Sequence, residues 1–261
     1  MKQWIIAVGA VWFGVAAAAQ TNSSSTPPNL TNADAPPPSM PAQLESATIP
    51  DNTRYLNDPS LLVGCKARLA AIQGQPCDIV FIGDSITERW LTVGKTTWDQ
   101  FYAPHHALNL GVRGDTTENV LWRLTNMDLQ SLNPKVAVIL IGTNNYANEP
   151  KEIAAGVEGV ISLTQNVLPG TKIILVSILP NRRANGKMVQ ADAILKTLAD
   201  NSTVYYLDLI PLMPPATDSS GEKTEPNWKG LGKDGLHPDA SGYALWANAM
   251  QPLLTKLLGG K

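Results

Sequence analysis

The sequence has few histidines and cysteines, and it lacks any run of basic residues. Three histidines and two cysteines occur among 261 residues, and the formal net charge is −2 at pH 7. Nothing therefore indicates a nucleic-acid-binding face or a patch for anionic membranes. No cluster of Cys, His or carboxylate residues has the spacing of metal ligands, which argues against a metallohydrolase.

The longest apolar run lies at the N-terminus. Lys2 precedes the apolar stretch Ile5 to Ala16, and small residues stand before Gln20. This pattern predicts a bacterial signal peptide over residues 1–19, and hence a secreted or periplasmic protein. The alternative is a retained membrane anchor, which needs about 20 apolar residues and a following charge cluster; we expect no stable anchor after processing.

Proline, serine, threonine and asparagine are abundant in residues 20–50. Such a segment buries too little apolar surface to fold alone, so it predicts a disordered leader. Residues 51–261 remain, and they are long enough for one globular domain. Export permits a disulfide between Cys65 and Cys77, which we expect to be structural. A cysteine nucleophile is the weaker alternative, since neither residue lies in a strand-to-helix turn.

Short apolar segments alternate with helical periodicity through the rest of the chain. Strands are predicted over residues 78–82, 107–110, 136–141, 172–178 and 204–207, and helices over 61–72, 85–90, 117–125, 151–168, 188–198 and 241–258. This alternation predicts an α/β three-layer sandwich with helices on both faces of a parallel sheet. Ligands bind at the carboxyl ends of the strands in such sheets, so chemistry is expected in the loops that follow them.

Ser85 stands in the loop after the first predicted strand, in Gly83-Asp84-Ser85-Ile86-Thr87. Gly83 permits a tight turn, and the backbone N–H of Ser85 is then free at a helix start to face a developing anion. The hydroxyl is a candidate nucleophile. The alternative is that Ser85 is an ordinary helix N-cap.

A nucleophilic serine needs a base, and His237 is the candidate. His105 and His106 precede the second strand, at its amino end, and we expect them to be structural or exposed. His237 lies in a turn before the last helix, and Asp234 is close enough in sequence to fold back on the imidazole. Asp234 would then fix the tautomer of His237. A surface turn capped by Asp234 is the alternative.

Two further loops offer hydrogen-bond donors for an oxyanion hole: a glycine-containing loop over residues 109–115 and an asparagine-containing loop over 141–145. We also expect four residues to contact substrate. Trp228 is interpreted as an exposed indole that stacks on a sugar or covers an acyl chain. The remaining candidates are Asp84, Arg113 and Asn145.

Four blocks in this order resemble the SGNH/GDSL hydrolase family: Gly83-Asp84-Ser85, the Gly114 loop, Gly142-Thr143-Asn144 and Asp234-x-x-His237. The stretch from Tyr102 to Asn145 is especially similar to the catalytic subunits of intracellular platelet-activating factor acetylhydrolases, and the similarity covers roughly residues 55–258. The resemblance implies a five-stranded flavodoxin-like sheet and no cofactor. It also implies a triad of Ser85, His237 and Asp234. The implied oxyanion donors are the Ser85 and Gly114 N–H groups and the Asn144 side chain.

The expected activity is hydrolysis of short-chain esters, acetyl esters foremost, through an acyl-enzyme. Predicted export favours an O-acetylated carbohydrate or another small-molecule ester as substrate. Arg113 stands where the acetylhydrolases have a small residue, so it could narrow the acyl pocket or bind a polar or anionic group. The alternative is that its side chain turns out to solvent. A lysophospholipase, thioesterase or arylesterase remains an alternative, as does a non-catalytic carbohydrate-binding module on this fold. The sequence makes no prediction of oligomeric state.

Overall fold

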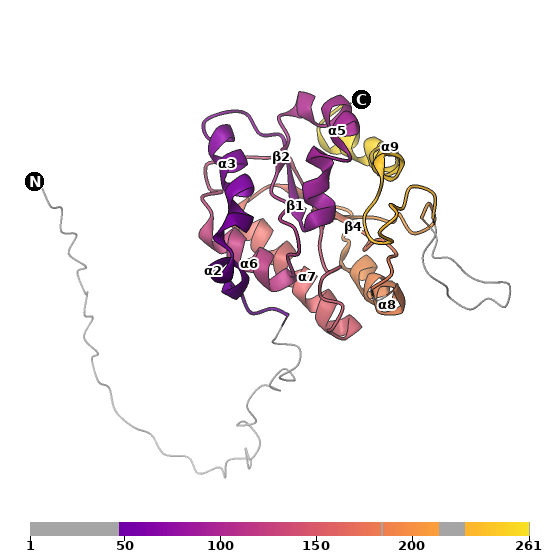
Figure 1. Cartoon of the computed structure of the whole chain (residues 1–261). Coiled ribbons are helices and arrows are strands. Elements are labelled where there is room, and N and C mark those ends of the chain that lie inside the picture. Colours follow the sequence, from indigo (N-terminus) through magenta and orange to yellow (C-terminus); the bar gives the residue numbers. More distant parts are fainter. Residues whose placement is uncertain (1–46, 184, 214–227, 261) are drawn as a thin grey trace, which may run out of the picture. The chain divides into compact units, whose positions relative to one another are not determined.

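A computed structural model of the chain describes residues 47–183, 185–213 and 228–260 (Figure 1). The predicted signal peptide and most of the predicted leader therefore lie outside the described residues. The folded part includes Ala47, which is fully buried and accepts a hydrogen bond from Thr117 Oγ1 at 3.0 Å. Among the described residues, no helix is both long and apolar enough to cross a membrane.

Five parallel strands form one sheet in the order β2-β1-β3-β4-β5. The predicted α/β fold with a parallel, flavodoxin-like sheet is confirmed. The strands are apolar because both faces of the sheet are covered. Their bounds are β1 Ile79–Gly83, β2 Leu108–Asn109, β3 Val136–Leu140, β4 Lys172–Val176 and β5 Val204–Leu207.

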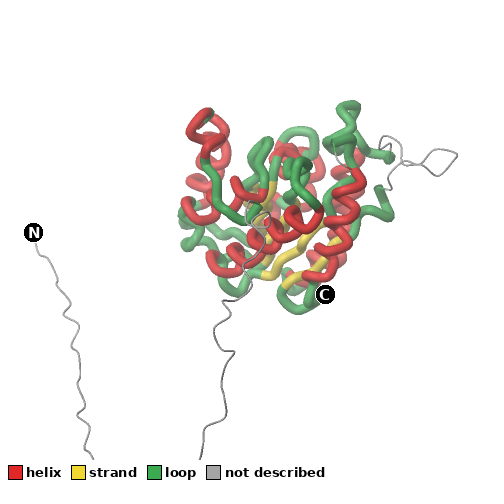
Figure 2. Tube along the Cα trace, turned by 90° about the horizontal axis from the view of Figure 1, so that it is seen from below, coloured by secondary structure: helices red, strands yellow, loops and turns green. Residues whose placement is uncertain are grey.

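Helices cover both faces of the sheet (Figure 2). Alternate side chains of β1 show the division, because Val80 and Ile82 belong to one apolar core while Ile79 and Phe81 belong to the other. The first core is closed by α3 (Val63–Ile72), α6 (Thr117–Asn126), α7 (Pro150–Val167) and α8 (Asn185–Leu195). The second is closed by α4 (Ser85–Glu88), α5 (Lys95–Phe101) and α9 (Ala240–Leu257). Such a three-layer arrangement leaves the strand ends free to carry loops.

Aromatic side chains fill the second core. Trp90 is fully buried, and its ring centroid lies 4.5 Å from that of Tyr243, 5.0 Å from Trp246 and 5.1 Å from Tyr102. Full burial of one large apolar side chain contributes roughly 1.5–3 kcal/mol. This packing anchors α9 and the 3-10 turn Arg89–Leu91 against the sheet, close to the start of α4.

Most predicted elements are present, with shifted ends. The strand β2 is shorter than the predicted strand over residues 107–110, because the Asn109 side chain takes part in the local hydrogen bonding. Its amide donates to Thr87 O at 2.7 Å and accepts from Gly111 N at 2.8 Å, so the chain turns toward α4. The short helix α2 (Thr53–Asn57) and α5 were not predicted.

The predicted disulfide between Cys65 and Cys77 is wrong. Both residues are free and buried. Cys65 Sγ lies 3.8 Å from Leu110 O, whereas Cys77 Sγ lies 3.5 Å from Ile79 O, so the two thiols contact different backbone groups. Burial raises the pKa of the Cys65 thiol, and that of Cys77 to about 11. Neither residue therefore has the reactive thiolate of a nucleophilic cysteine.

Candidate active site

Ser85 lies in the turn that joins β1 to α4, at the carboxyl end of the sheet. Asp84 is the N-cap of α4 and accepts a hydrogen bond from Ile86 N at 2.8 Å. Gly83 is required at the strand end, because a Cβ there would lie 2.3 Å from Leu140 O. As the first residue of α4, Ser85 has no intrahelical acceptor for its backbone N–H.

The structure brings His237 to Ser85 across 152 residues of sequence. Ser85 Oγ and His237 Nε2 are 2.8 Å apart, and His237 Nδ1 lies 2.7 Å from Asp234 Oδ2. The turn holds Asp234 in place, since its Oδ1 accepts from the backbone N–H groups of Leu236 and His237 at 3.0 Å each. A hydroxyl, an imidazole and a carboxylate thus form one continuous hydrogen-bonded chain.

The pKa of His237 is lowered mainly by burial, since only 11% of its side chain is exposed. The hydrogen bond to Asp234 opposes this effect, while the positive charges of Arg89 and Arg183 add to it. Partial burial disfavours ionisation of Asp234, but hydrogen bonds from His237 and Leu236 outweigh it and hold the pKa of Asp234 below its usual range. The imidazole is therefore neutral and the carboxylate ionised at neutral pH, as a general base and its partner require.

Two other loops at the carboxyl edge of the sheet carry candidate donors for an anion, Gly114 and Asn144. Gly114 has φ +76°, a conformation that glycine adopts readily, and no acceptor for its N–H is found among the described residues. Asn144 donates from Nδ2 to Asp115 O at 2.8 Å and, more weakly, toward Asp84 Oδ2 at 3.4 Å. Arg183 Nη1 donates to Asn144 Oδ1, which fixes the orientation of the amide.

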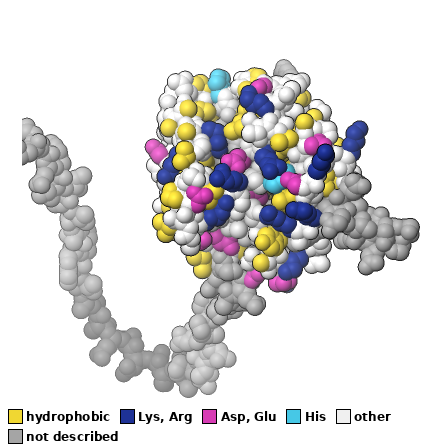
Figure 3. Space-filling model, in the orientation of Figure 1, with side chains coloured by type: hydrophobic (Ala, Val, Ile, Leu, Met, Phe, Trp, Pro, Cys, Tyr) yellow, Lys and Arg dark blue, Asp and Glu magenta, His cyan; other side chains and the backbone are white. Residues whose placement is uncertain are grey.

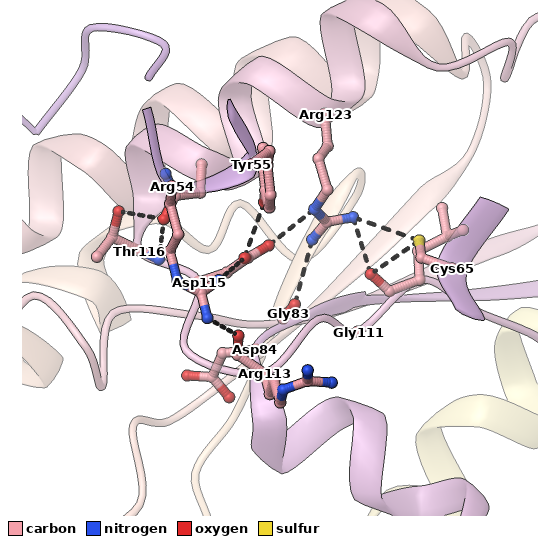
Figure 4. Close-up of polar contacts among 12 residues, drawn as sticks. Arg54, Tyr55, Cys65, Gly83, Asp84, Gly111, Arg113, Asp115, Thr116 and Arg123 are labelled. Carbon is pink, nitrogen blue, oxygen red and sulfur yellow. Dashed lines mark hydrogen bonds and ion pairs between the residues drawn. The ribbon is translucent and has the colours of Figure 1, made fainter. Parts of the chain in front are cut away.

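An ionic cluster contacts the loop that carries Gly114 (Figure 4). Asp115 accepts from Arg123 Nε at 2.7 Å, Tyr55 Oη at 2.8 Å and Arg54 Nη1 at 3.1 Å. The fully buried Arg123 also donates to Leu110 O at 2.8 Å and Gly83 O at 3.3 Å. One guanidinium thus ties the ends of β1 and β2 to the loop that carries Gly114.

Comparison with known proteins fits this geometry: residues 81–245 match the GDSL-like lipase/acylhydrolase family. The chain belongs to this family. The hydrolase is 34% identical over 183 residues to platelet-activating factor acetylhydrolase IB subunit alpha2 of Rattus norvegicus. The aligned region covers 69% of this chain and 77% of the relative. It is 31% identical over 192 residues to the alpha1 subunit of Bos taurus, and the aligned region covers 69% of this chain and 76% of that relative. The predicted resemblance is confirmed, and the protein is a serine ester hydrolase.

Solved structures share the fold of this GDSL hydrolase. A GDSL-like lipase from Bacteroides thetaiotaomicron matches with a TM-score of 0.55 at 22% identity, covering 78% of this chain and 96% of the other. Est24, a carbohydrate acetylesterase from Sinorhizobium meliloti, matches with a TM-score of 0.54 at 18% identity, and the match covers 70% of this chain and 100% of the other. These likenesses concern the arrangement of helices and strands.

Three of the residues expected to contact substrate in this GDSL hydrolase are buried. Asp84 is completely buried as the N-cap of α4, and burial raises its pKa to about 7. Asn145 accepts from Thr117 N at 3.0 Å and so fixes the start of α6. Trp228 is only 4% exposed and donates from Nε1 to Pro180 O at 3.0 Å, so the prediction of an exposed indole is wrong. These side chains shape the loops and do not face the solvent.

Arg113 is exposed, immediately before Gly114, and its carbonyl accepts from Arg54 Nη2 at 2.5 Å. It remains a candidate for contact with substrate. His105 and His106 lie apart from Ser85, at the amino end of β2, where His106 Nδ1 is 3.8 Å from Asp78 Oδ2. Among the described residues, no group of three or more His, Cys, Asp or Glu side chains is arranged to hold a metal ion.

Sequence reasoning missed three arginines of this hydrolase. Arg89 Nη1 lies 3.4 Å from Asp234 Oδ2, Arg183 contacts Asn144, and Arg123 binds Asp115. The sequence carried a signal for Arg183, because it follows β4 in a loop at the carboxyl edge of the sheet. No signal marked Arg123, since a single arginine on a helix is typical of a solvent-exposed face.

Proposed function

We propose that Ser85, His237 and Asp234 are the catalytic triad of an exported esterase that removes acetyl and other short acyl groups from carbohydrate. The observation that carries the proposal is the unbroken contact from Ser85 Oγ to His237 Nε2 at 2.8 Å and from His237 Nδ1 to Asp234 at 2.7 Å. This order of groups lets a hydroxyl lose its proton as it attacks a carbonyl carbon.

In the first step, Ser85 Oγ forms a bond to the ester carbonyl carbon while its proton passes to His237 Nε2. Asp234 stabilises the imidazolium that results. The carbonyl oxygen becomes an oxyanion, for which the Ser85 N–H, the Gly114 N–H and Asn144 Nδ2 are the proposed donors. Only one Nδ2 hydrogen of Asn144 is committed to a short bond, with Asp115 O, so the other is available to the substrate.

Collapse of this tetrahedral intermediate breaks the bond to the alcohol oxygen, which takes the proton from His237. An acyl-Ser85 ester remains. Water then gives a proton to His237 Nε2 as its oxygen adds to the acyl carbon, and release of Ser85 Oγ with that proton yields the carboxylic acid. Atoms balance as one ester and one water giving one acid and one alcohol, with no cofactor.

Two observations support a short acyl group on a carbohydrate. The similar fold of Est24 belongs to a protein described as a carbohydrate acetylesterase. The acetylhydrolase relatives are likewise named for an acetyl group.

A fluorophosphonate probe tests the triad directly, because it reacts only with an activated serine. We expect wild-type protein to be labelled at Ser85 and to release acetate from acetylated oligosaccharides, whereas Ser85→Ala does neither. His237→Ala serves as the matched variant that keeps the serine but removes the base. Labelling of wild type at another residue, or none at all, contradicts the proposal and favours a non-catalytic binding module.

The competing activities within this family differ in acyl length and alcohol. A series of 4-nitrophenyl esters from acetate to palmitate separates them, and we expect kcat/KM to fall as the chain lengthens beyond four carbons. A maximum at long chains would favour a lysophospholipase, and faster cleavage of acyl thioesters would favour a thioesterase.

The proposed export has its own test. Mass spectrometry of the protein recovered outside the cytoplasm should find an N-terminus at Gln20, the residue after the predicted cleavage site. Recovery of an intact Met1 N-terminus in the cytoplasm would contradict export without affecting the triad.

A further inference from the structure

Arginines gather at the edge of the sheet where Ser85 lies, although the chain as a whole has a formal net charge of −2. Three segments supply them. Arg89 follows Ser85 by about one helical turn, Arg113 precedes Gly114, and Arg182 and Arg183 follow β4. The face drawn in Figure 3 shows basic side chains grouped around a histidine.

Contacts with site residues fix the positions of the Arg183 side chain and of the Arg182 backbone. Arg183 donates to Asn144 Oδ1, and its guanidinium carbon lies 5.4 Å from the centre of the Tyr146 ring. The backbone N–H of Arg182 donates to Gly235 O at 2.9 Å, which joins the loop after β4 to the turn that carries His237. The arginines therefore belong to the same loops that form the site.

The positive charge at this edge is poorly balanced. Among the described residues, Arg113, Arg182 and Arg183 have no carboxylate within 4.0 Å. Arg89 does have one, but its partner Asp234 is also the partner of His237. Burial is the largest cause of the lowered pKa of His237, and the positive charges of Arg89 and Arg183 lower that pKa further. The positive field of these arginines therefore reaches the imidazole.

We propose that the ester cleaved by this hydrolase carries an anionic group, a carboxylate or a phosphate, in its alcohol portion, and that Arg183 binds that group. The inference rests on the proposed function, in which the acyl group is acetyl and therefore uncharged, so the charge lies on the alcohol. A guanidinium can donate two parallel hydrogen bonds to a carboxylate or phosphate. Tyr146, which is 48% exposed beside Arg183, adds a flat surface for a sugar ring.

Three matched aryl acetates test the proposal: 4-acetoxybenzoate, 4-acetoxyphenyl phosphate and the uncharged methyl 4-acetoxybenzoate. For wild type and Arg183→Gln, the readout is kcat/KM of each anionic ester divided by kcat/KM of the methyl ester. This ratio isolates anion binding, because loss of the contact with Asn144 lowers turnover of all three esters alike. Loss of a charge-assisted hydrogen bond should reduce the ratio about tenfold.

Lys256→Gln is the matched control for removal of one positive charge. Lys256 is exposed near the end of α9, roughly 25 Å along the helix from its start beside His237 at about 1.5 Å per residue. Its ratios should equal those of wild type. For wild type, the preference for anionic esters should also weaken as the salt concentration rises. If Arg183→Gln lowers the kcat/KM ratio of the phosphate ester more than that of the carboxylate ester, phosphate is the preferred group.

The two possible failures are distinguishable. Equal ratios in wild type and Arg183→Gln, with the methyl ester still cleaved, would overturn the inference and leave the proposed function intact. Absence of cleavage of all three esters, together with absence of fluorophosphonate labelling, would overturn the proposed function and the inference with it.

Discussion

Opposing influences act on His237. Burial and the charges of Arg89 and Arg183 favour the neutral imidazole, while the hydrogen bond to Asp234 favours the protonated form. Burial and the arginine charges outweigh the hydrogen bond to Asp234, so the pKa of His237 lies below the ordinary value of about 6.5. A base that remains neutral in mildly acidic solution can accept the serine proton there.

We therefore expect kcat/KM to fall as pH decreases through a single inflection below about 6.5, because only the neutral imidazole accepts a proton. Arg89→Gln removes a nearby positive charge, which should raise the pKa of His237 and move the inflection to higher pH. Lys256→Gln is the charge-matched control and should leave the profile unchanged. An inflection above pH 7 in wild type, or one that does not move in Arg89→Gln, would contradict this account.

Substitution of Asn144 tests the proposed oxyanion hole most directly. Loss of one oxyanion donor costs about 10²–10³ in kcat, so Asn144→Ala should be nearly inactive. Its circular dichroism spectrum should match that of wild type, since the side chain is only partly buried. The matched variant Asn145→Ala should instead lose stability, because the buried amide of Asn145 fixes the start of α6. Near-normal turnover in Asn144→Ala would exclude its role as a donor.

Among the elements, β1, β2 and the Gly114 loop depend on one another through Arg123. Its guanidinium is fully buried on α6, with Asp115 as ionic partner and carbonyls of both strand ends as acceptors. A buried pair of this kind adds little stability by itself, but removal of one member leaves a buried charge without a partner. The cluster thus fixes the geometry of the loop more than it stabilises the fold.

Arg123→Met should lower the free energy of unfolding by about 3–5 kcal/mol, as measured by urea denaturation. Turnover should fall as well, since the loop that carries Gly114 loses its support. In the double variant Arg123→Met/Asp115→Asn no stranded carboxylate remains, so the loss of stability should be smaller than the sum of the two single losses. Additive losses would argue against a coupled ionic cluster.

At the scale of the whole molecule, two apolar cores hold the three layers together without a covalent link in the described residues. Both cysteines are free, and each is buried on the α3 side of the sheet. Proteins exported to oxidising compartments commonly contain disulfides. If the proposed export holds, the packing of helices on both faces of the sheet makes one unnecessary in this chain.

A reductant should therefore leave the melting temperature unchanged. Alkylation after denaturation without reductant should modify both Cys65 and Cys77, as measured by intact mass. Under native conditions the same reagent should react slowly with either residue, because both thiols are buried and their pKa values are raised. A mass that shows no alkylation until reductant is added would reveal a disulfide and contradict the structure.

The sequence by itself determined the fold class and the loops in which chemistry is expected, and the family resemblance implied a five-stranded flavodoxin-like sheet. These features are local or periodic: apolar strands, amphipathic helices, and the blocks around Ser85, Gly114, Asn144 and His237 are readable from neighbouring residues. Such patterns do not specify which side chain turns inward. For that reason Trp228, Asn145 and Asp84 were expected at the surface of the site, and a bridge was expected between two cysteines that contact different groups.

Only the tertiary structure decided the contacts between distant segments. The 2.8 Å approach of Ser85 Oγ to His237 Nε2, the support of the Gly114 loop by Arg123, and the contacts of Arg89 with Asp234 and of Arg183 with Asn144 all join parts of the chain that are far apart in sequence. The physical reason is that burial and charge pairing depend on the surroundings of a side chain in space. Those surroundings exist only once the helices have packed on the sheet.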